Sequence, residues 1–308
     1  MTARLIEPTD PIDITYIPML IFGPPGSWKT TLAQTADNPI TLDFDNGIHR
    51  CANRKRAMRF DAWSECVEAG AKGMFNEYKT LVIDTGGRAL DTMIPEILKE
   101  NAKNGYAGNL APQGWGVLGS RFTTWMKTVR SWGKDVVMLC HEDIGKDAAG
   151  NPDVAPDMPG KMSLKEMHKI FDIIGRIRYN GQQRVLDFSP CEGAICCKNA
   201  AGWDPMVLPD LHATANHNFL ANLIADAKKR LGQLSLASAE VARAVSCFQT
   251  WLEKKPGLED FNSGMTDLLE LNGAAKKQAG ALVMAYAEAH GWVYNTEKKT
   301  FVVKEAAK

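Results

Sequence analysis

The first two thirds of the chain alternate short, continuous apolar runs with longer amphipathic stretches. Such runs are typical of strands buried on both faces, and their alternation with helices indicates a mostly parallel sheet covered by helices on both sides. We therefore predict an α/β fold. The predicted strands lie at residues 14–22, 40–44, 79–84 and 135–140, and the predicted helices between them lie at 62–72, 87–102 and 117–131.

The pattern changes further along the chain. Residues 143–162 are rich in Asp, Gly and Pro and are predicted to form a long polar loop. A helix at 163–171 then precedes two runs, 173–179 and 184–188, that have the pattern of antiparallel strands. The remaining predicted elements are a candidate strand at 194–197, a helix at 216–230, an entirely helical region at 235–290 and a closing hairpin at 291–303.

These changes of pattern divide the chain into three predicted parts. Residues 1–13 carry charges of both signs and two prolines without periodicity, so we expect a loose N-terminal arm. Residues 14–230 are expected to form the α/β core. Residues 231–308 are expected to form a small, mainly helical C-terminal domain that ends in a β-hairpin.

Composition and charge narrow the class of protein. The 36 Lys and Arg residues balance 36 Asp and Glu residues, so any nucleic-acid surface must be a local patch. Seven cysteines in 308 residues do not form the pattern of a disulfide framework. The first residues contain no apolar secretory segment, and no apolar run approaches the roughly 20 residues of a membrane span. We expect a cytoplasmic protein with free thiols and no membrane association.

A segment at the end of the first predicted strand matches the phosphate-binding pattern G-x-x-x-x-G-K-[ST] at every position but one. Its backbone N–H groups and the start of the following helix can bind phosphate. Lys29 supplies a positive charge for the β- and γ-phosphates, and Thr30 supplies a hydroxyl ligand for Mg²⁺. The predicted ATP-binding residues are Gly23, Pro24, Pro25, Gly26, Ser27, Trp28, Lys29, Thr30 and Thr31.

The one departure from the pattern is Trp28, which occupies the position of the second glycine. If the backbone there requires a positive φ, a residue other than glycine costs about 1–2 kcal/mol. The indole could also crowd the nucleotide or stack on a neighbouring group. A strained loop with weak binding or slow turnover therefore stays open as an interpretation.

Polar residues at the ends of other predicted strands complete the expected site. Asp84 ends the third strand in the Walker B manner, and its carboxylate is expected to hold Mg²⁺ beside Thr30. Asp45 is expected to orient or deprotonate the attacking water, with Asp43 as the competing candidate. His141 follows the fourth strand and is expected beside the γ-phosphate, where it could report the nucleotide state to residues 143–162.

Six segments occur in a characteristic order: GPPGSWKTT (23–31), LDFDNG (42–47), KTLVIDT (79–85), VVMLCHED (136–143), GKMSLKEMHKIFDIIGRIR (160–178) and CCKN (196–199). Together they resemble the RecA-like recombinase ATPases, in particular the phage-encoded RecA-like NTPases associated with single-strand annealing and recombination. The resemblance spans about residues 14–225. It implies a RecA-like P-loop core that binds ATP and Mg²⁺, acts on single-stranded DNA and forms a homo-oligomer.

The resemblance also implies roles for individual residues. Asp45 matches the catalytic acid position, where glutamate is usual, and His141 matches the switch residue that senses the γ-phosphate, usually glutamine. Residues 143–162 and 103–116 match mobile DNA-contacting segments. Lys198 matches a lysine that reaches the nucleotide of a neighbouring subunit, so the implied catalytic set is Asp45, His141 and Lys198.

Local chemistry supports the contact with DNA less strongly than it supports nucleotide binding. Residues 143–162 are net acidic, which disfavours binding to phosphate. The basic segment from Arg50 to Arg59 is a better electrostatic candidate, although a solvated turn explains it equally well.

We therefore predict a Mg²⁺-dependent ATPase that acts in DNA recombination or annealing. A nucleotide-gated DNA- or protein-binding module with little or no turnover is the alternative, and both Trp28 and the aspartate at position 45 favour it. A P-loop kinase of a small molecule is a second alternative, which the lack of arginine in residues 143–162 disfavours.

Overall fold

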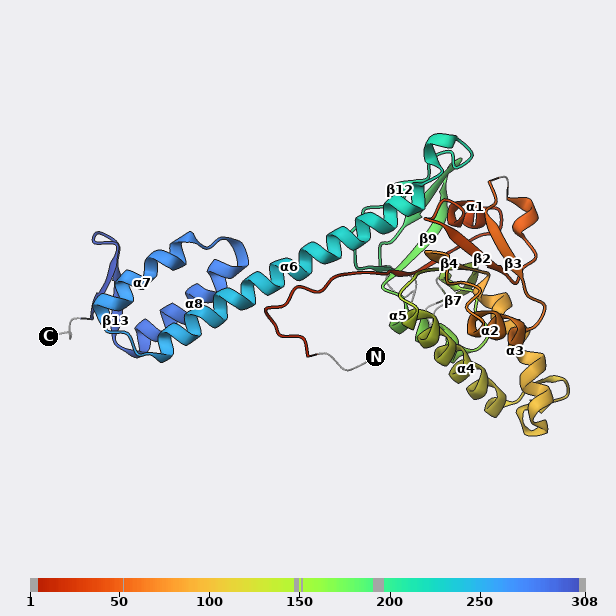
Figure 1. The fold of residues 1–308 in the computed structure, drawn as a ribbon, viewed down its shortest axis with the longest axis horizontal. Coiled ribbons are helices and arrows are strands. Elements are labelled where there is room, and N and C mark those ends of the chain that lie inside the picture. Colours follow the sequence, from red (N-terminus) through yellow and green to blue (C-terminus); the bar gives the residue numbers. More distant parts are fainter. Residues whose placement is uncertain (1–4, 52, 147–149, 151, 191–196, 305–308) are drawn as a thin grey trace. The chain divides into compact units, whose positions relative to one another are not determined.

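A mostly parallel sheet forms the centre of residues 14–231 in the computed structural model, which describes residues 5–51, 53–146, 150, 152–190 and 197–304 (Figure 1). Its strand order is β3-β2-β4-β7-β1-β9-β10-β12. The pairs from β3 to β9 are parallel, and β10 and β12 add an antiparallel edge. The strands are β1 (Pro18–Gly23), β2 (Pro39–Asp43), β3 (Arg56–Arg59), β4 (Thr80–Asp84), β7 (Asp135–Lys146), β9 (Ile173–Asn180), β10 (Gln183–Asp187) and β12 (Met206–Val207).

Helices cover both faces of this sheet because successive residues of each strand point to opposite sides. In β1, Leu20 and Phe22 join one apolar core, whereas Met19 and Ile21 join the other. The first core includes residues of α2 (Trp63–Ala71), α3 (Gly86–Glu100), α4 (Pro112–Ser131) and α5 (Lys161–Ile170), and the second includes residues of α1 (Lys29–Ala33) and the start of α6 (Phe219–Glu253). The predicted α/β core, with a mostly parallel sheet and helices on both faces, is confirmed.

The register of the central strands brings the predicted polar positions to one edge. Gly23, the last residue of β1, lies opposite His141 in β7. Asp84, the last residue of β4, lies opposite Asp43 in β2 and Leu139 in β7. The carboxyl ends of four parallel strands therefore meet where the phosphate-binding pattern begins, which is the usual place for a ligand in an open α/β sheet.

Residues 143–162 and 103–116 contain strands that the sequence pattern does not predict. Residues 143–162 do not form one long loop: β7 continues to Lys146 and pairs antiparallel with β8 (Pro152–Pro156), from Glu142 opposite Pro156 to Lys146 opposite Pro152. Residues 147–149 and 151 lie outside the described part of the chain. In the other segment, residues 103–116, the 3₁₀ turn η2 (Ala102–Asn104) and the hairpin of β5 (Gly105–Tyr106) and β6 (Asn109–Leu110) precede α4.

The region after the sheet is helical, as predicted, but it has no break near residue 230. Helix α6 is continuous over 35 residues. It is followed by α7 (Leu258–Glu270), α8 (Gly273–Ala289) and the predicted hairpin of β13 (Trp292–Asn295) and β14 (Thr300–Val303). The shorter elements of the core are the 3₁₀ turns η1 (Ile48–Arg50) and η3 (Thr214–Asn216), and β11 (Lys198–Asn199), which pairs with β9. Of the strand expected at 194–197, residues 194–196 lie outside the described part of the chain.

Residues 232–308 form a second compact unit together with the N-terminal arm. Its core is aromatic: the ring of Phe261 contacts those of Trp251, Tyr286 and Phe301. The arm is tied to this unit through the amide of Ile12, which donates to the Ser235 hydroxyl at 2.6 Å. Over the described ranges, no helix combines the length and apolar character needed to span a membrane.

Candidate functional site

A cavity of about 440 Å³ opens at the carboxyl edge of β1, β4 and β7. It collects the predicted positions 25–31 from the phosphate-binding pattern, Asp45 after β2, Asp84 at the end of β4 and His141 in β7. Four further lining residues were not predicted as site residues: Gly47, Arg50, Cys51 and Thr85. The structure thus brings segments separated by more than a hundred residues to one cavity.

Trp28 adopts the left-handed conformation that its position in the pattern calls for, with φ of 73° and ψ of 20°. The guanidinium of Arg184 lies 3.8 Å from the centre of the indole ring, and the ring of His212 contacts it edge-on at 5.4 Å. The backbone strain of about 1–2 kcal/mol is therefore opposed by a cation–π contact of about 0.5–2 kcal/mol and by aromatic packing.

Strand β10, which carries Arg184, and its neighbour β9 also support the backbone of the phosphate loop. The hydroxyl of Tyr179 in β9 donates to the carbonyl of Gly26 at 3.3 Å, and Nη2 of Arg184 in β10 donates to the same carbonyl at 3.5 Å. Gly26 itself has φ of 75°, which glycine adopts without strain. The indole at position 28 is thus held by the β9–β10 hairpin.

Replacing Trp28 by alanine is expected to destabilise the protein by about 1 kcal/mol more than replacing it by glycine. Both changes remove the contact with Arg184, but only alanine keeps a Cβ in the left-handed conformation. Urea unfolding of both variants measures the difference. Arg184→Ala is expected to weaken wild type more than it weakens Trp28→Gly, and equal effects of all these changes would contradict the compensation.

Lys29 directs its ammonium group into the phosphate loop. Its Nζ donates to the carbonyls of Gly23 and Pro24, each at 2.8 Å, and lies 3.5 Å from the Ser27 hydroxyl. Only 7% of the residue is exposed, and this burial lowers the pKa of the ammonium group below its ordinary value. The charge therefore occupies a desolvated position, where an incoming phosphate would gain more from it than on an open surface.

Thr30 and Asp84, the two predicted magnesium ligands, contact each other. The Thr30 hydroxyl donates to Oδ2 of Asp84 at 2.7 Å. Asp84 is 3% exposed, and burial raises the pKa of its carboxyl to about 6. A hydroxyl and a carboxylate are the hard oxygen donors that Mg²⁺ accepts. In the described part of the chain no group of three His, Cys, Asp or Glu residues is placed to hold a metal ion, so a bound ion would take its remaining ligands from phosphate and water.

The two candidate acids, Asp43 at the end of β2 and Asp45 just after it, have different surroundings. The carboxylate of Asp43 accepts hydrogen bonds from the amides of Gly47 and Ile48, at 3.0 and 3.3 Å, and the residue is 1% exposed. It therefore holds the turn. Asp45 lines the cavity, and its amide donates to the carbonyl of Asp84 at 3.1 Å. Of the two, Asp45 is the carboxylate that a substrate can reach.

His141 lines the cavity next to the phosphate loop. Burial, and then the nearby charge of Lys29, lower the pKa of its imidazole, which favours the neutral ring. Its Nδ1 is buried and has no hydrogen-bond partner within the residues that the structure describes. Its carbonyl accepts a hydrogen bond from the amide of Asp157 at 2.8 Å, directly after β8. His141 therefore lies at the base of the β7–β8 hairpin.

The structure does not bring Lys198 to the cavity. Its Nζ donates to the carbonyls of His168 and Phe171, at 3.2 and 2.9 Å, where α5 ends. A lysine at a helix C-terminus satisfies carbonyls that have no partner within the helix. Its expected contact with a neighbouring subunit's nucleotide is untested in a single chain.

The basic segment from Arg50 to Arg59 does not form one patch. Arg56 pairs with Glu77 at 2.8 Å, and Arg59 pairs with Asp61 at 3.4 Å. Arg50 instead turns into the cavity and pairs with Asp45 at 2.9 Å. The signal that could have identified Arg50 is its position five residues after the candidate acid.

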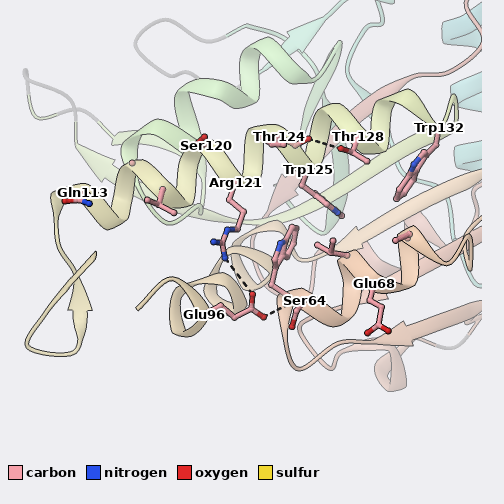
Figure 2. A pocket seen from close by; sticks show the side chains of 16 residues that line it. Ser64, Glu68, Glu96, Gln113, Ser120, Arg121, Thr124, Trp125, Thr128 and Trp132 are labelled. Carbon is pink, nitrogen blue, oxygen red and sulfur yellow. Dashed lines mark hydrogen bonds and ion pairs between the residues drawn. The ribbon is translucent and has the colours of Figure 1, made fainter. Parts of the chain in front are cut away.

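A larger cavity of the core lies elsewhere. It is a groove of about 1030 Å³ between α2 and α4, with Trp63, Trp125 and Trp132 among its lining residues (Figure 2). Within it, Glu96 accepts a hydrogen bond from the Ser64 amide at 2.9 Å and lies 3.8 Å from Arg121. It shares no residue with the phosphate loop, so size does not identify the reactive site.

The region that contains the cavity at the carboxyl edge of β1, β4 and β7 is similar to known proteins. The model of the AAA domain family matches residues 15–196. No curated protein matches the chain. Similar solved structures include a KaiC-like protein from the hyperthermophilic archaeon Pyrococcus horikoshii OT3, with 10% identity, a TM-score of 0.36 and coverage of 65% of this chain and 99% of the other. They also include the flagellar accessory protein FlaH from Methanocaldococcus jannaschii, with 11% identity, a TM-score of 0.35 and coverage of 64% and 85%.

Proposed function

Because the chain belongs to the AAA domain family, we propose that it binds ATP with Mg²⁺ in the cavity at the carboxyl edge of β1, β4 and β7 and hydrolyses it. The observation that carries the proposal is the contact of 2.7 Å between the Thr30 hydroxyl and the Asp84 carboxylate, inside the cavity that also contains Lys29. This arrangement presents a phosphate cradle and a magnesium site side by side.

Each group has a distinct role in the proposed reaction. The loop amides and Lys29 bind the phosphates and orient the γ-phosphorus. Thr30 and Asp84 would hold Mg²⁺, which neutralises phosphate charge when bound. A water oxygen forms a bond to the γ-phosphorus, the bond from that phosphorus to the bridging oxygen breaks, and ADP leaves. Asp45 accepts the proton of the attacking water. His141 senses the γ-phosphate through its unpartnered ring nitrogen.

Asp45→Asn is expected to lower kcat for ATP hydrolysis by about 100-fold or more, with less than about a threefold change in the Kd for ATP. The amide cannot accept the proton, whereas the loop amides and Lys29 remain. Phosphate release and fluorescent-nucleotide binding measure the two quantities. Asp43→Asn is the matched change two residues away, and it is expected to act on the stability of the turn. Unchanged kcat in Asp45→Asn would exclude the assigned role.

A nucleotide-gated module with little turnover is the second candidate. Two observations favour it: Trp28 holds the loop in a strained conformation, and Asp45 is paired with cations. Saturable, Mg²⁺-dependent ATP binding without phosphate release in the wild-type protein would support the module over the enzyme.

We further propose single-stranded DNA as the partner whose binding depends on the nucleotide state. The support is that β7 runs from His141 in the cavity to Lys146 in the β7–β8 hairpin without a break. Asp143 and Asp153 lie on the same hairpin, so we expect the contact to weaken at modest salt.

Gel-shift titrations with single- and double-stranded DNA, with and without ATP, test this part. Light scattering of the same samples tests the homo-oligomer. No shift under any condition at low salt would remove the role in recombination while leaving ATP binding intact.

A further inference from the structure

Arg50 is a second cation of the nucleotide cavity, outside the phosphate loop. It ends η1, which follows the turn held by the Asp43 carboxylate. Its guanidinium lies against Gly47, where a Cβ would be 2.5 Å from Nη2. The absence of a side chain at Gly47 therefore leaves the space that this guanidinium occupies beside the cavity.

The ion pairs of Arg50 and Arg88 show which cation is available to a ligand. Nη2 of Arg50 is 2.9 Å from Oδ2 of Asp45, and Nε of Arg88 is 3.6 Å from the other oxygen, Oδ1. Arg88 also pairs with Asp91 on its own helix at 3.1 Å. The Arg50 side chain is 65% exposed, lines the cavity, and has Asp45 as its ion-pair partner among the described residues. If Arg50 leaves, Arg88 still compensates the charge of Asp45.

The charges in the cavity explain why a ligand would attract Arg50. The lining residues include the carboxylates Asp45 and Asp84, and Lys29 is the one cation of the phosphate loop. A nucleoside triphosphate brings several more negative charges to the same space. A guanidinium carries five donors in a planar fork that fits phosphate oxygens, and charge-assisted bonds of this kind are among the strongest in proteins.

We propose that Arg50 exchanges its carboxylate partner for the terminal phosphate of a bound nucleoside triphosphate. In the nucleotide-free protein it pairs with Asp45, and this pair keeps the carboxylate occupied. When the triphosphate binds, the guanidinium moves to the γ-phosphate oxygens, and one oxygen of Asp45 becomes free to receive the proton of the attacking water. Arg50 thus selects triphosphate over diphosphate and couples that selection to release of the acid. This inference rests on the proposed function of the cavity.

The test compares the affinities of ATP and ADP for Arg50→Gln, Arg50→Lys and Arg88→Gln, measured with Mg²⁺ and fluorescent analogues. Arg50→Gln is expected to weaken ATP binding by about tenfold or more and ADP binding by less than about threefold. Arg50→Lys keeps the charge without the fork and is expected to restore part of the preference. Arg88→Gln removes the other cation of Asp45 from outside the cavity, and it is expected to leave the ratio of the two affinities unchanged.

The outcomes separate this inference from the proposal on which it rests. Wild-type protein that binds neither nucleotide would overturn both. Wild-type protein that binds ATP, with the same ATP-to-ADP ratio in Arg50→Gln, would overturn the role of Arg50 alone. Equal losses of ATP affinity in Arg50→Gln and Arg88→Gln would assign the effect to the charge of Asp45 and would also overturn it. The solvent exposure of Arg50 favours folded variants, and circular dichroism checks this for each.

Discussion

Asp84→Asn is expected to stabilise the nucleotide-free protein at pH 8 while abolishing Mg²⁺-dependent turnover. Burial raises the pKa of this carboxyl from 3.8 to about 6. The folded protein therefore binds the proton more tightly than the unfolded chain does, and the ionised carboxylate lowers stability above about pH 6. This cost disappears as the pH falls toward the ordinary pKa. This rise in pKa corresponds to about 3 kcal/mol, which is an upper bound for the gain in the free energy of unfolding at pH 8.

The asparagine keeps the local geometry, because its side-chain oxygen can accept the hydrogen bond that Thr30 donates to Asp84. Urea unfolding of the two proteins at pH 8 and at pH 4.5, with a chelator, measures the difference in free energy. The gain is expected to be large at pH 8 and to shrink at pH 4.5. Adding Mg²⁺ and ATP at pH 8 is expected to stabilise wild type more than the variant. A gain of the same size at both pH values would show that the buried charge is not its cause.

Short sequence motifs predict those parts of the site that are formed by one continuous segment of backbone. The phosphate loop and the Walker B strand can each be recognised in the sequence, because each is a single continuous segment. In the phosphate loop, a strand end, a tight bend and a helix start follow one another along the chain. The register of β1, β4 and β7 then places Gly23, Asp84 and His141 together. The sequence does not decide which acid faces the cavity, because Asp43 and Asp45 are two residues apart and would lie on the same face of an extended strand. They differ in their hydrogen-bond partners, which only the structure shows.

The errors arise where a local signal competes with tertiary structure. Gly232 follows the basic run 228–230 and has the pattern of a helix end, yet α6 continues through it without a positive φ. In residues 143–162, the many turn-forming residues predict a loop, whereas the structure forms a hairpin in which β8 pairs with β7. Helix α4 begins at Pro112, five residues before the predicted start, because proline suits the first turn of a helix.

Lys29→Ala is expected to weaken both ATP binding and turnover by about 100-fold or more. Lys29 is the one ammonium group among the residues that line the cavity, and 7% of it is exposed. Burial lowers its pKa, which means that the charged ammonium group is destabilised in the empty site. A bound phosphate would stabilise this charge. Lys29→Met removes the same charge but keeps most of the aliphatic stem, and it is expected to give a similar loss of affinity.

Stability separates this effect from a general collapse of the loop. Nζ of Lys29 donates to two backbone carbonyls, and so does Nζ of Lys198 at the end of α5. Lys198→Ala is therefore the matched control: it removes an equivalent pair of hydrogen bonds away from the cavity and is expected to leave the ATP affinity of the isolated chain within about threefold of wild type. Titration of all three variants with a fluorescent ATP analogue, alongside thermal unfolding, measures both properties. Retention of wild-type affinity by folded Lys29→Ala and Lys29→Met would show that the ligand's phosphates bind somewhere other than this loop.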